Sequence, residues 1–111
     1  FYDLAMEISP EDANLVFVGG VNIWRSGNTG TIWALSAHGY GFGGAPWVHP
    51  DIHFLKYHPT RSGVLYACND GGIAVSTNDG DTWRDISKGL RIQQYYSLST
   101  TDLQVNLTLA G

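Results

Sequence analysis

The feature that most constrains the fold is an internal repeat. The segment SGNTGTIW at 26–33 returns as STNDGDTW at 76–83, at a constant offset of 50 positions. The matched pairs are Ser26 and Ser76, Asn28 and Asn78, Gly30 and Gly80, and Trp33 and Trp83. Upstream, Pro10 and Pro59 anchor a second match that is one residue out of step. Copies at such a spacing fold as repeated supersecondary units that bury their apolar faces against one another.

Each copy is expected to form four short β-strands, because its alternating β-rich segments are broken by Gly, Asn, Asp and Pro. No segment keeps a 3.6-residue period, so little helix is expected. The strands are predicted at 2–9, 14–19, 22–26 and 31–36, and again at 52–57, 64–68, 72–76 and 82–86. Four strands in roughly 45–50 residues is the size of a β-propeller blade. The sequence therefore predicts an all-β chain of four-stranded antiparallel propeller blades.

The repeat divides the 111 residues into four parts. They are a first blade at 1–36, a loop rich in glycine and aromatic residues at 37–50, a second blade at 51–90 and the start of a third at 91–111. Propellers close with about 4–8 blades. About two and a half blades therefore predict a fragment of a larger propeller, with several copies assembled into one ring as the alternative.

The two matched turns have a physical rationale. Ser and Asn side chains accept hydrogen bonds from backbone N–H groups, glycine supplies a positive φ, and the closing Trp is expected to cover the turn. The pattern resembles the Asp-box of BNR repeats in sialidases, sortilin-type receptors and xyloglucanase-type glycoside hydrolases. Asn replaces the usual Asp in both copies, and Thr82 completes the pattern only in the second. The resemblance implies a structural role for both turns.

A wider resemblance covers nearly the whole chain. YDLAMEISPEDANLVFVGGVNIWRS, WVHPDIHFLKYHP, LYACNDGGIAVSTNDGDTW and GLRIQQYYSLSTT follow in that order. Together they are similar to large secreted or cell-surface proteins of the Bacteroidetes type, which carry these repeats and are often exported by type IX secretion. The resemblance implies an extracellular or cell-surface bacterial propeller.

The charge and the apolar content of the chain limit the classes of partner that it can be expected to bind. The net charge is −4 and the basic residues are scattered, which argues against nucleic acid and anionic membrane surfaces. No apolar run approaches the ~20 residues of a membrane span, so no membrane insertion is expected. The expected partners are a polysaccharide or a cell-surface protein, together with the rest of the same propeller.

The segment VHPDIHF at 48–54 spaces His49, Asp51 and His53 at every second position. On an extended chain these side chains would form one polar row on the inner strand of the second blade. At ~3.3 Å per residue the two histidines lie ~13 Å apart, whereas zinc ligands converge within ~2 Å of the metal. A three-ligand site on a straight strand is thereby excluded. The row could still face the channel, brace its rim, or share an ion with another blade.

Two further segments are candidate ligand sites. Asp70, in Asn-Asp-Gly-Gly, reads first as a hairpin turn, with a channel-mouth or Ca²⁺ role as the alternative. The loop SAHGYGFGGAPW offers Tyr40, Phe42 and Trp47 as rings that could stack on a sugar or fold onto the blade edge. No cofactor is expected, with Ca²⁺ or Zn²⁺ as the alternatives.

Catalysis has little support in the sequence. A glycosidase needs two carboxyl groups that flank the bond, and Asp51 is a weak candidate, with Asp70 as its counterpart. The leading hypothesis is a non-catalytic binding or adhesion scaffold. Its rival is part of a xyloglucanase- or sialidase-like glycoside hydrolase whose carboxylates lie partly outside this segment, and a purely architectural module is the third reading.

Overall fold

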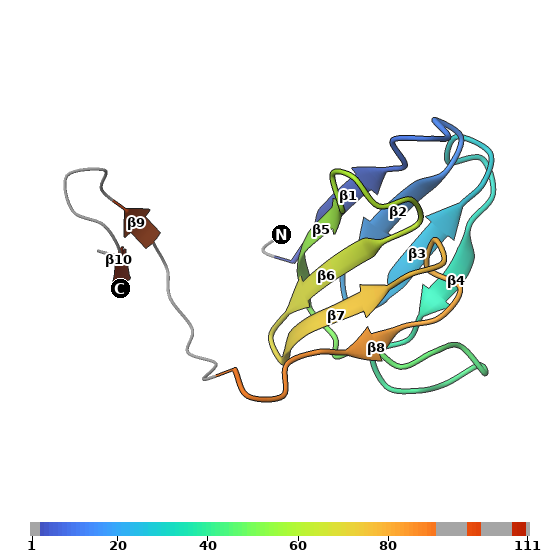
Figure 1. Cartoon of the computed structure of the whole chain (residues 1–111). Coiled ribbons are helices and arrows are strands. Elements are labelled where there is room, and N and C mark those ends of the chain that lie inside the picture. Colours follow the sequence, from blue (N-terminus) through green and yellow to red (C-terminus); the bar gives the residue numbers. More distant parts are fainter. Residues whose placement is uncertain (1–2, 91–97, 101–107, 111) are drawn as a thin grey trace.

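A computed structural model describes residues 3–90, 98–100 and 108–110, the last two ranges as backbone alone. Within these residues all regular structure is β, and the first eight strands form two four-stranded antiparallel sheets (Figure 1). The first sheet contains β1 Ala5–Ile8, β2 Val16–Gly19, β3 Ile23–Ser26 and β4 Ala34–Ala37. The second contains β5 Ile52–Tyr57, β6 Leu65–Asn69, β7 Gly72–Ser76 and β8 Arg84–Asp85. The expected pair of four-stranded antiparallel sheets is confirmed.

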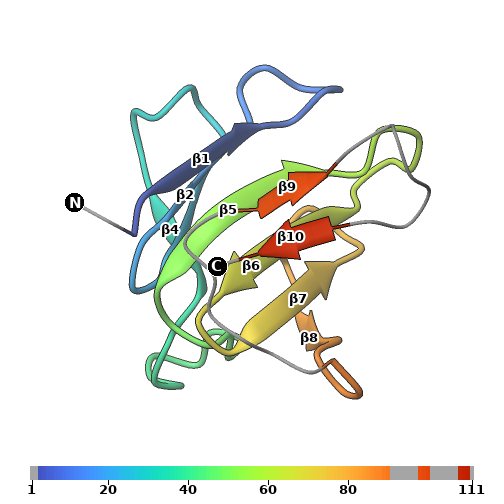
Figure 2. The same cartoon turned by 90° about the vertical axis from the view of Figure 1, so that its left-hand side faces the viewer.

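Both sheets run in sequence order, each strand pairing with the next along the chain. The first strands of the two sheets, β1 and β5, lie side by side (Figure 2). The predicted start of a third blade lies mostly outside the described residues, and inside it β9 Leu98–Thr100 pairs antiparallel with β10 Thr108–Ala110.

The core fills the space between the two sheets. From the first sheet Phe17 and Ile23 are both 0% exposed, and from the second Leu65 and Ala67 are 0% exposed. The Phe17 ring meets the Tyr57 ring edge to face, with centroids 6.1 Å apart, a geometry that aromatic pairs favour. The two sheets are thus one packed unit rather than two independent hairpin stacks.

The last strand of each sheet starts later than predicted. β4 begins at Ala34 instead of 31, and β8 at Arg84 instead of 82. The residues before these strands belong to the two turns, where side chains, not strand partners, accept the backbone N–H groups. The first strand ends before the predicted 9, because the hydroxyl of Ser9 accepts the N–H groups of Glu11 and Asp12 and turns the chain.

Candidate functional site

Strand direction decides which loops lie together. β1 and β5 start at the same end of the two sheets, and because the strands alternate in direction, loop 38–51 and the β6–β7 turn lie there too (Figure 1). We call this the entrance end. The turns at 26–33 and 76–83 lie at the opposite end, which we call the turn end. Every candidate ligand-binding residue from the sequence lies at the entrance end.

Loop 38–51 is held in shape by its own hydrogen bonds. The His38 N–H donates to the Pro46 carbonyl at 2.9 Å, and the Trp47 indole N–H donates to the Gly39 carbonyl at 3.0 Å. The Gly39 N–H in turn donates to the Asn22 side chain at 2.9 Å, which ties the loop to the β2–β3 turn. The loop is anchored at both ends of its aromatic stretch.

The rings of this loop face outward. Tyr40, Phe42 and Trp47 are 66%, 68% and 51% exposed, which favours the interpretation in which the rings are available to a ligand over the one in which they fold onto the blade edge. Sequence reasoning missed His38, whose imidazole lies edge to face with Phe42 at 5.5 Å and with Tyr40 at 6.2 Å. Its Nδ1 also accepts the Tyr40 N–H at 3.0 Å. The sequence signal that could have identified His38 was its position at the start of a loop rich in glycine and aromatic residues.

The predicted alternating row of His49, Asp51 and His53 is not formed. β5 begins only at Ile52, and Asp51 has a φ of 62°, which takes the chain out of extended geometry. A β-bulge between Ile52 and Phe54 then makes His53 the extra residue in the ladder. Bulges re-aim side chains, so the three side chains do not share one strand face.

His49 joins the aromatic loop to the β6–β7 turn. Its ring lies edge to face with Trp47 at a centroid distance of 6.3 Å, and Nδ1 lies 3.0 Å from the Pro50 carbonyl. A Cβ at Gly71 would lie 2.4 Å from the same imidazole, so the ring covers the turn backbone at a position that requires glycine.

Hydrogen bonds from Ser87 lower the pKa of the Asp85 carboxyl group, with a smaller contribution from the nearby His49.

The imidazole of His53 is flanked by two carboxylates. Nε2 lies 2.6 Å from Asp70 Oδ1, and Nδ1 lies 3.2 Å from Asp3 Oδ1. Asp3 precedes β1 of the first sheet, and Asp70 lies in the hairpin between β6 and β7 of the second. This cluster therefore ties the two sheets together at the entrance end. Sequence reasoning grouped His53 with its strand neighbours and missed Asp3. The available signal was that Asp3 is a charged residue at the position where the second copy has the hydrophobic Ile52.

The β6–β7 connection is a two-residue hairpin, as the Asn-Asp-Gly-Gly motif suggested. Asn69 pairs with Gly72, and the Asn69 side chain accepts the Gly71 N–H at 3.0 Å. Asp70 thus has both a turn role and a partner in His53. Within the described residues no group of three His, Cys, Asp or Glu side chains is arranged to hold a metal ion.

The two turns at the turn end share one hydrogen-bond pattern. In the second, Ser76 Oγ accepts the Gly80 N–H at 2.8 Å and Asn78 Oδ1 accepts the Thr82 N–H at 2.9 Å. In the first, Ser26 Oγ accepts the Gly30 N–H at 2.9 Å and Asn28 Oδ1 accepts the Ile32 N–H at 2.8 Å. These contacts satisfy backbone donors that the short strands leave unpaired.

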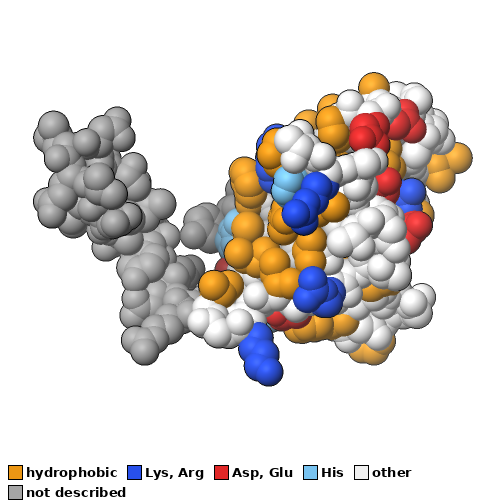
Figure 3. All heavy atoms as spheres, in the orientation of Figure 1, with side chains coloured by type: hydrophobic (Ala, Val, Ile, Leu, Met, Phe, Trp, Pro, Cys, Tyr) orange, Lys and Arg blue, Asp and Glu red, His pale blue; other side chains and the backbone are white. Residues whose placement is uncertain are grey.

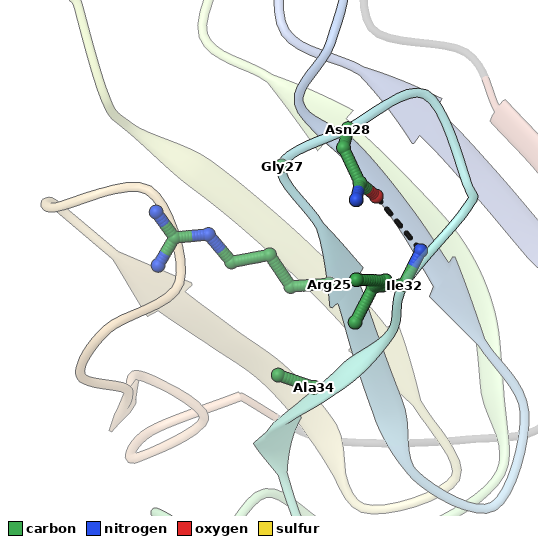
Figure 4. A pocket seen from close by; sticks show the side chains of 5 residues that line it. All are labelled: Arg25, Gly27, Asn28, Ile32 and Ala34. Carbon is green, nitrogen blue, oxygen red and sulfur yellow. Dashed lines mark hydrogen bonds between the residues drawn. The ribbon is translucent and has the colours of Figure 1, made fainter.

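A pocket of about 390 Å³ lies beside the first turn, lined by Arg25, Gly27, Asn28, Ile32 and Ala34 (Figure 4). The Arg25 side chain points away from its strand and forms an ion pair with Asp81 of the second turn. The pocket lies at the end opposite the aromatic loop and contains none of the ligand candidates. All five lining residues belong to the first sheet or its turn, and the Arg25 guanidinium is already paired with Asp81 of the second turn.

Comparison with known proteins adds the fold class. No protein-family model and no curated protein matches the chain. A solved structure that does match is the crystal structure of an ancestral GH74 enzyme, with a TM-score of 0.55 and 16% sequence identity. The match covers 74% of this chain but 12% of that enzyme.

At this identity the likeness shows the fold alone. The two sheets are β-propeller blades, which places the chain in the all-β, propeller-type class of folds. Strands β1–β4 are hereafter blade 1 and strands β5–β8 blade 2. No helix in the described part of the chain has the length and hydropathy needed to cross a membrane.

Proposed function

We propose that this chain is part of an extracellular or cell-surface β-propeller that binds a carbohydrate chain at the entrance end. The observation that carries the proposal is the set of exposed rings on loop 38–51, held by the loop's own hydrogen bonds. Aromatic faces pack on the apolar faces of sugar rings, and rings that are already positioned lose little conformational entropy on binding. At the turn end, by contrast, the Ser and Asn side chains of the two turns are engaged by the backbone N–H groups of their own turns.

The aromatic loop continues into a polar surface. Trp47 contacts His49, the His49 ring covers Gly71, and the neighbouring Asp70 pairs with His53. Apolar rings beside carboxylate and imidazole groups match a sugar, which offers C–H faces and hydroxyl edges to the same surface. The surface is therefore suited to a neutral polysaccharide segment that spans more than one sugar unit.

Titration calorimetry with cello-, xyloglucan- and chito-oligosaccharides tests the proposal on the 111-residue chain. We expect binding that Trp47→Ala and Tyr40→Ala each weaken about two- to twelvefold, because stacking of one ring is worth roughly 0.5–1.5 kcal/mol. Trp24→Ala is the matched control, since Trp24 is also partly exposed but lies on blade 1 away from the loop. Equal loss in the control, or no binding to any polysaccharide, would contradict the proposal.

A second candidate is a segment of a glycoside hydrolase, favoured by the fold shared with the GH74 enzyme. Asp51 has the features of a candidate carboxylate: it lies at the entrance end and has a φ of 62°, a conformation that non-glycine residues adopt at a cost and often at functional sites. Release of reducing sugar from plant or algal polysaccharides by the parent protein tests this candidate. Abolition of that release by Asp51→Asn, but not by Asp12→Asn in the β1–β2 loop, would support it.

A further inference from the structure

We propose that Asn22, in the β2–β3 turn of blade 1, is the positioning residue for the Trp47 ring and thereby sets the affinity of the entrance end for its ligand. The inference rests on the proposed function, because the ligand is the carbohydrate chain inferred above. The Asn22 side chain is half-buried and accepts the Gly39 N–H at 2.9 Å. This bond joins residues 17 positions apart, so it connects the turn to loop 38–51 instead of closing the turn itself.

The Trp47 ring belongs to an exposed apolar surface. Figure 3 shows hydrophobic side chains at the surface of the entrance end as well as over β5–β7 of blade 2. Trp47 itself is 51% exposed. Because no core surrounds an exposed ring, its orientation depends on the hydrogen bonds that hold it to its loop.

Gly39 connects Asn22 to Trp47 through its two backbone polar groups. Its N–H donates to Asn22 Oδ1, and its carbonyl accepts the Trp47 indole N–H at 3.0 Å. The indole has a single N–H donor and no acceptor, so this bond fixes the direction of the ring as well as its place. A ring that is held in one orientation before binding loses little side-chain freedom when a sugar stacks on it.

The β2–β3 turn also holds the far end of the loop. The Ile52 N–H donates to the Gly20 carbonyl at 2.8 Å. Between the two attachments the chain is tightly packed, because a Cβ at Gly39 would lie 2.7 Å from the Val21 carbonyl oxygen and 2.8 Å from Pro50 Cβ. A backbone carbonyl cannot move aside as the end of a flexible side chain can. Position 39 therefore requires glycine, and its place against the turn is fixed.

The repeat supports a role for Asn22 outside its own hairpin. At the offset of 50, Asn22 corresponds to Gly72 in blade 2, which has no side chain. The β6–β7 hairpin nevertheless forms, with Asn69 paired to Gly72. Two neighbouring strands of a blade can therefore be joined without a side-chain acceptor at this position. The acceptor is present in the blade that the loop rich in glycine and aromatic residues follows.

The tip of the loop is held differently. The Phe42 ring packs edge to face against His38, with centroids 5.5 Å apart. Gly43 and Gly44, which follow Phe42, have φ values of 72° and 71°. Apart from chain neighbours, no atom of the described residues lies within 4 Å of a Cβ built at either glycine. We therefore expect Asn22 to position Trp47 but not Phe42.

Asn22→Ala tests the inference in the 111-residue chain. Without ligand, we expect faster hydrogen exchange at the Trp47 indole N–H and the Gly39 amide, and unchanged exchange at the Thr82 amide of the turn end. Titration with the same cello-, xyloglucan- and chito-oligosaccharides should show about three- to tenfold weaker binding, because binding must then also order the ring. Asn22→Asp should restore both the slow exchange and the affinity, because an ionised carboxylate accepts the same N–H.

Asn78→Ala is the matched control, since Asn78 Oδ1 also accepts a backbone N–H at 2.9 Å, but at the turn end. It should leave both the exchange at Trp47 and the binding unchanged. A double-mutant cycle then separates positioning from direct contact with the ligand. Asn22→Ala should weaken binding no further in a chain that already carries Trp47→Ala, whereas its effect should add to that of Phe42→Ala.

Unchanged exchange at the Trp47 indole in Asn22→Ala would overturn the inference, and so would losses that add to those of Trp47→Ala. Failure of Asn22→Asp to restore slow exchange would also overturn it, because the acceptor would then not be what holds the loop. If the 111-residue chain binds none of the oligosaccharides, the proposed function fails and the effect on affinity fails with it. Faster exchange in Asn22→Ala would still support Asn22 as the residue that positions Trp47.

Discussion

The Ser36 hydroxyl on the last strand of blade 1 donates a 2.6 Å hydrogen bond to the carbonyl of Gly80 in the turn of blade 2. The same oxygen accepts the Trp83 indole N–H at 3.1 Å, and Ser36 is 5% exposed. One buried hydroxyl thus satisfies two groups of the neighbouring blade. It makes the turn of blade 2 part of the interface with blade 1.

Ser36→Ala should destabilise the chain by about 1–3 kcal/mol, because it leaves a buried carbonyl and an indole N–H without partners. Urea unfolding followed by Trp fluorescence measures the loss. A double-mutant cycle with Trp83→Phe isolates the coupling between the two side chains. Additive effects would mean that the hydrogen bond contributes nothing beyond packing.

Gly80→Ala should cost more than Gly30→Ala in the 111-residue chain. Both substitutions put Cβ into a positive-φ backbone at about 1–2 kcal/mol. At Gly80 the new Cβ also overlaps Phe17 and Ser36, which adds about 1–3 kcal/mol of overpacking. Thermal unfolding of both variants gives the comparison, and equal losses would show that the blades separate to relieve the contact.

Tyr57 should make stability fall at high pH. Burial raises the pKa of the Tyr57 hydroxyl above its ordinary value, and its 2.7 Å hydrogen bond to Asp79 and the Asp79 charge raise it further. Above pH ~10 the unfolded chain therefore binds fewer protons than the folded chain, and stability declines as pH rises. Tyr57→Phe should flatten the decline seen in urea unfolding between about pH 9 and 11. Tyr40→Phe, on the exposed loop, should leave it unchanged, and a decline that survives in Tyr57→Phe would contradict this assignment.

The Asn78 side chain should stabilise the turn at 76–83 more than the Asn28 side chain stabilises the turn at 26–33. Asn78 Oδ1 accepts the Thr82 N–H, and its amide donates to Thr82 Oγ1 at 2.9 Å. Asn28 accepts the Ile32 N–H, but Ile32 has no hydroxyl to receive a second bond. Asn78→Ala should cost about 1–2 kcal/mol and Asn28→Ala less, as for side-chain caps of backbone N–H groups. Hydrogen exchange of the Thr82 and Ile32 amides reports each turn directly, and greater loss at Ile32 would reverse the assignment.

Sequence alone determined the repeat and hence the class of fold. The matched turns at 26–33 and 76–83 require Ser, Asn and Gly for local reasons, namely backbone N–H groups to satisfy and a positive φ to adopt. Local patterns of this kind are readable without tertiary information. The alternation of short apolar segments then fixed four strands per copy, with errors where side-chain hydrogen bonds replace strand pairing.

Only the tertiary structure decided how the polar residues group. His53 looked like a member of a row with His49 and Asp51, but a bulge and a positive φ break the row. Asp3, fifty positions earlier, and Asp70 become its partners because β1 and β5 lie side by side. A bulge depends on how two strands pair, and contacts between blades depend on how two sheets pack. Neither leaves a periodic signal in the sequence, which is why the turns could be predicted and the cluster around His53 could not.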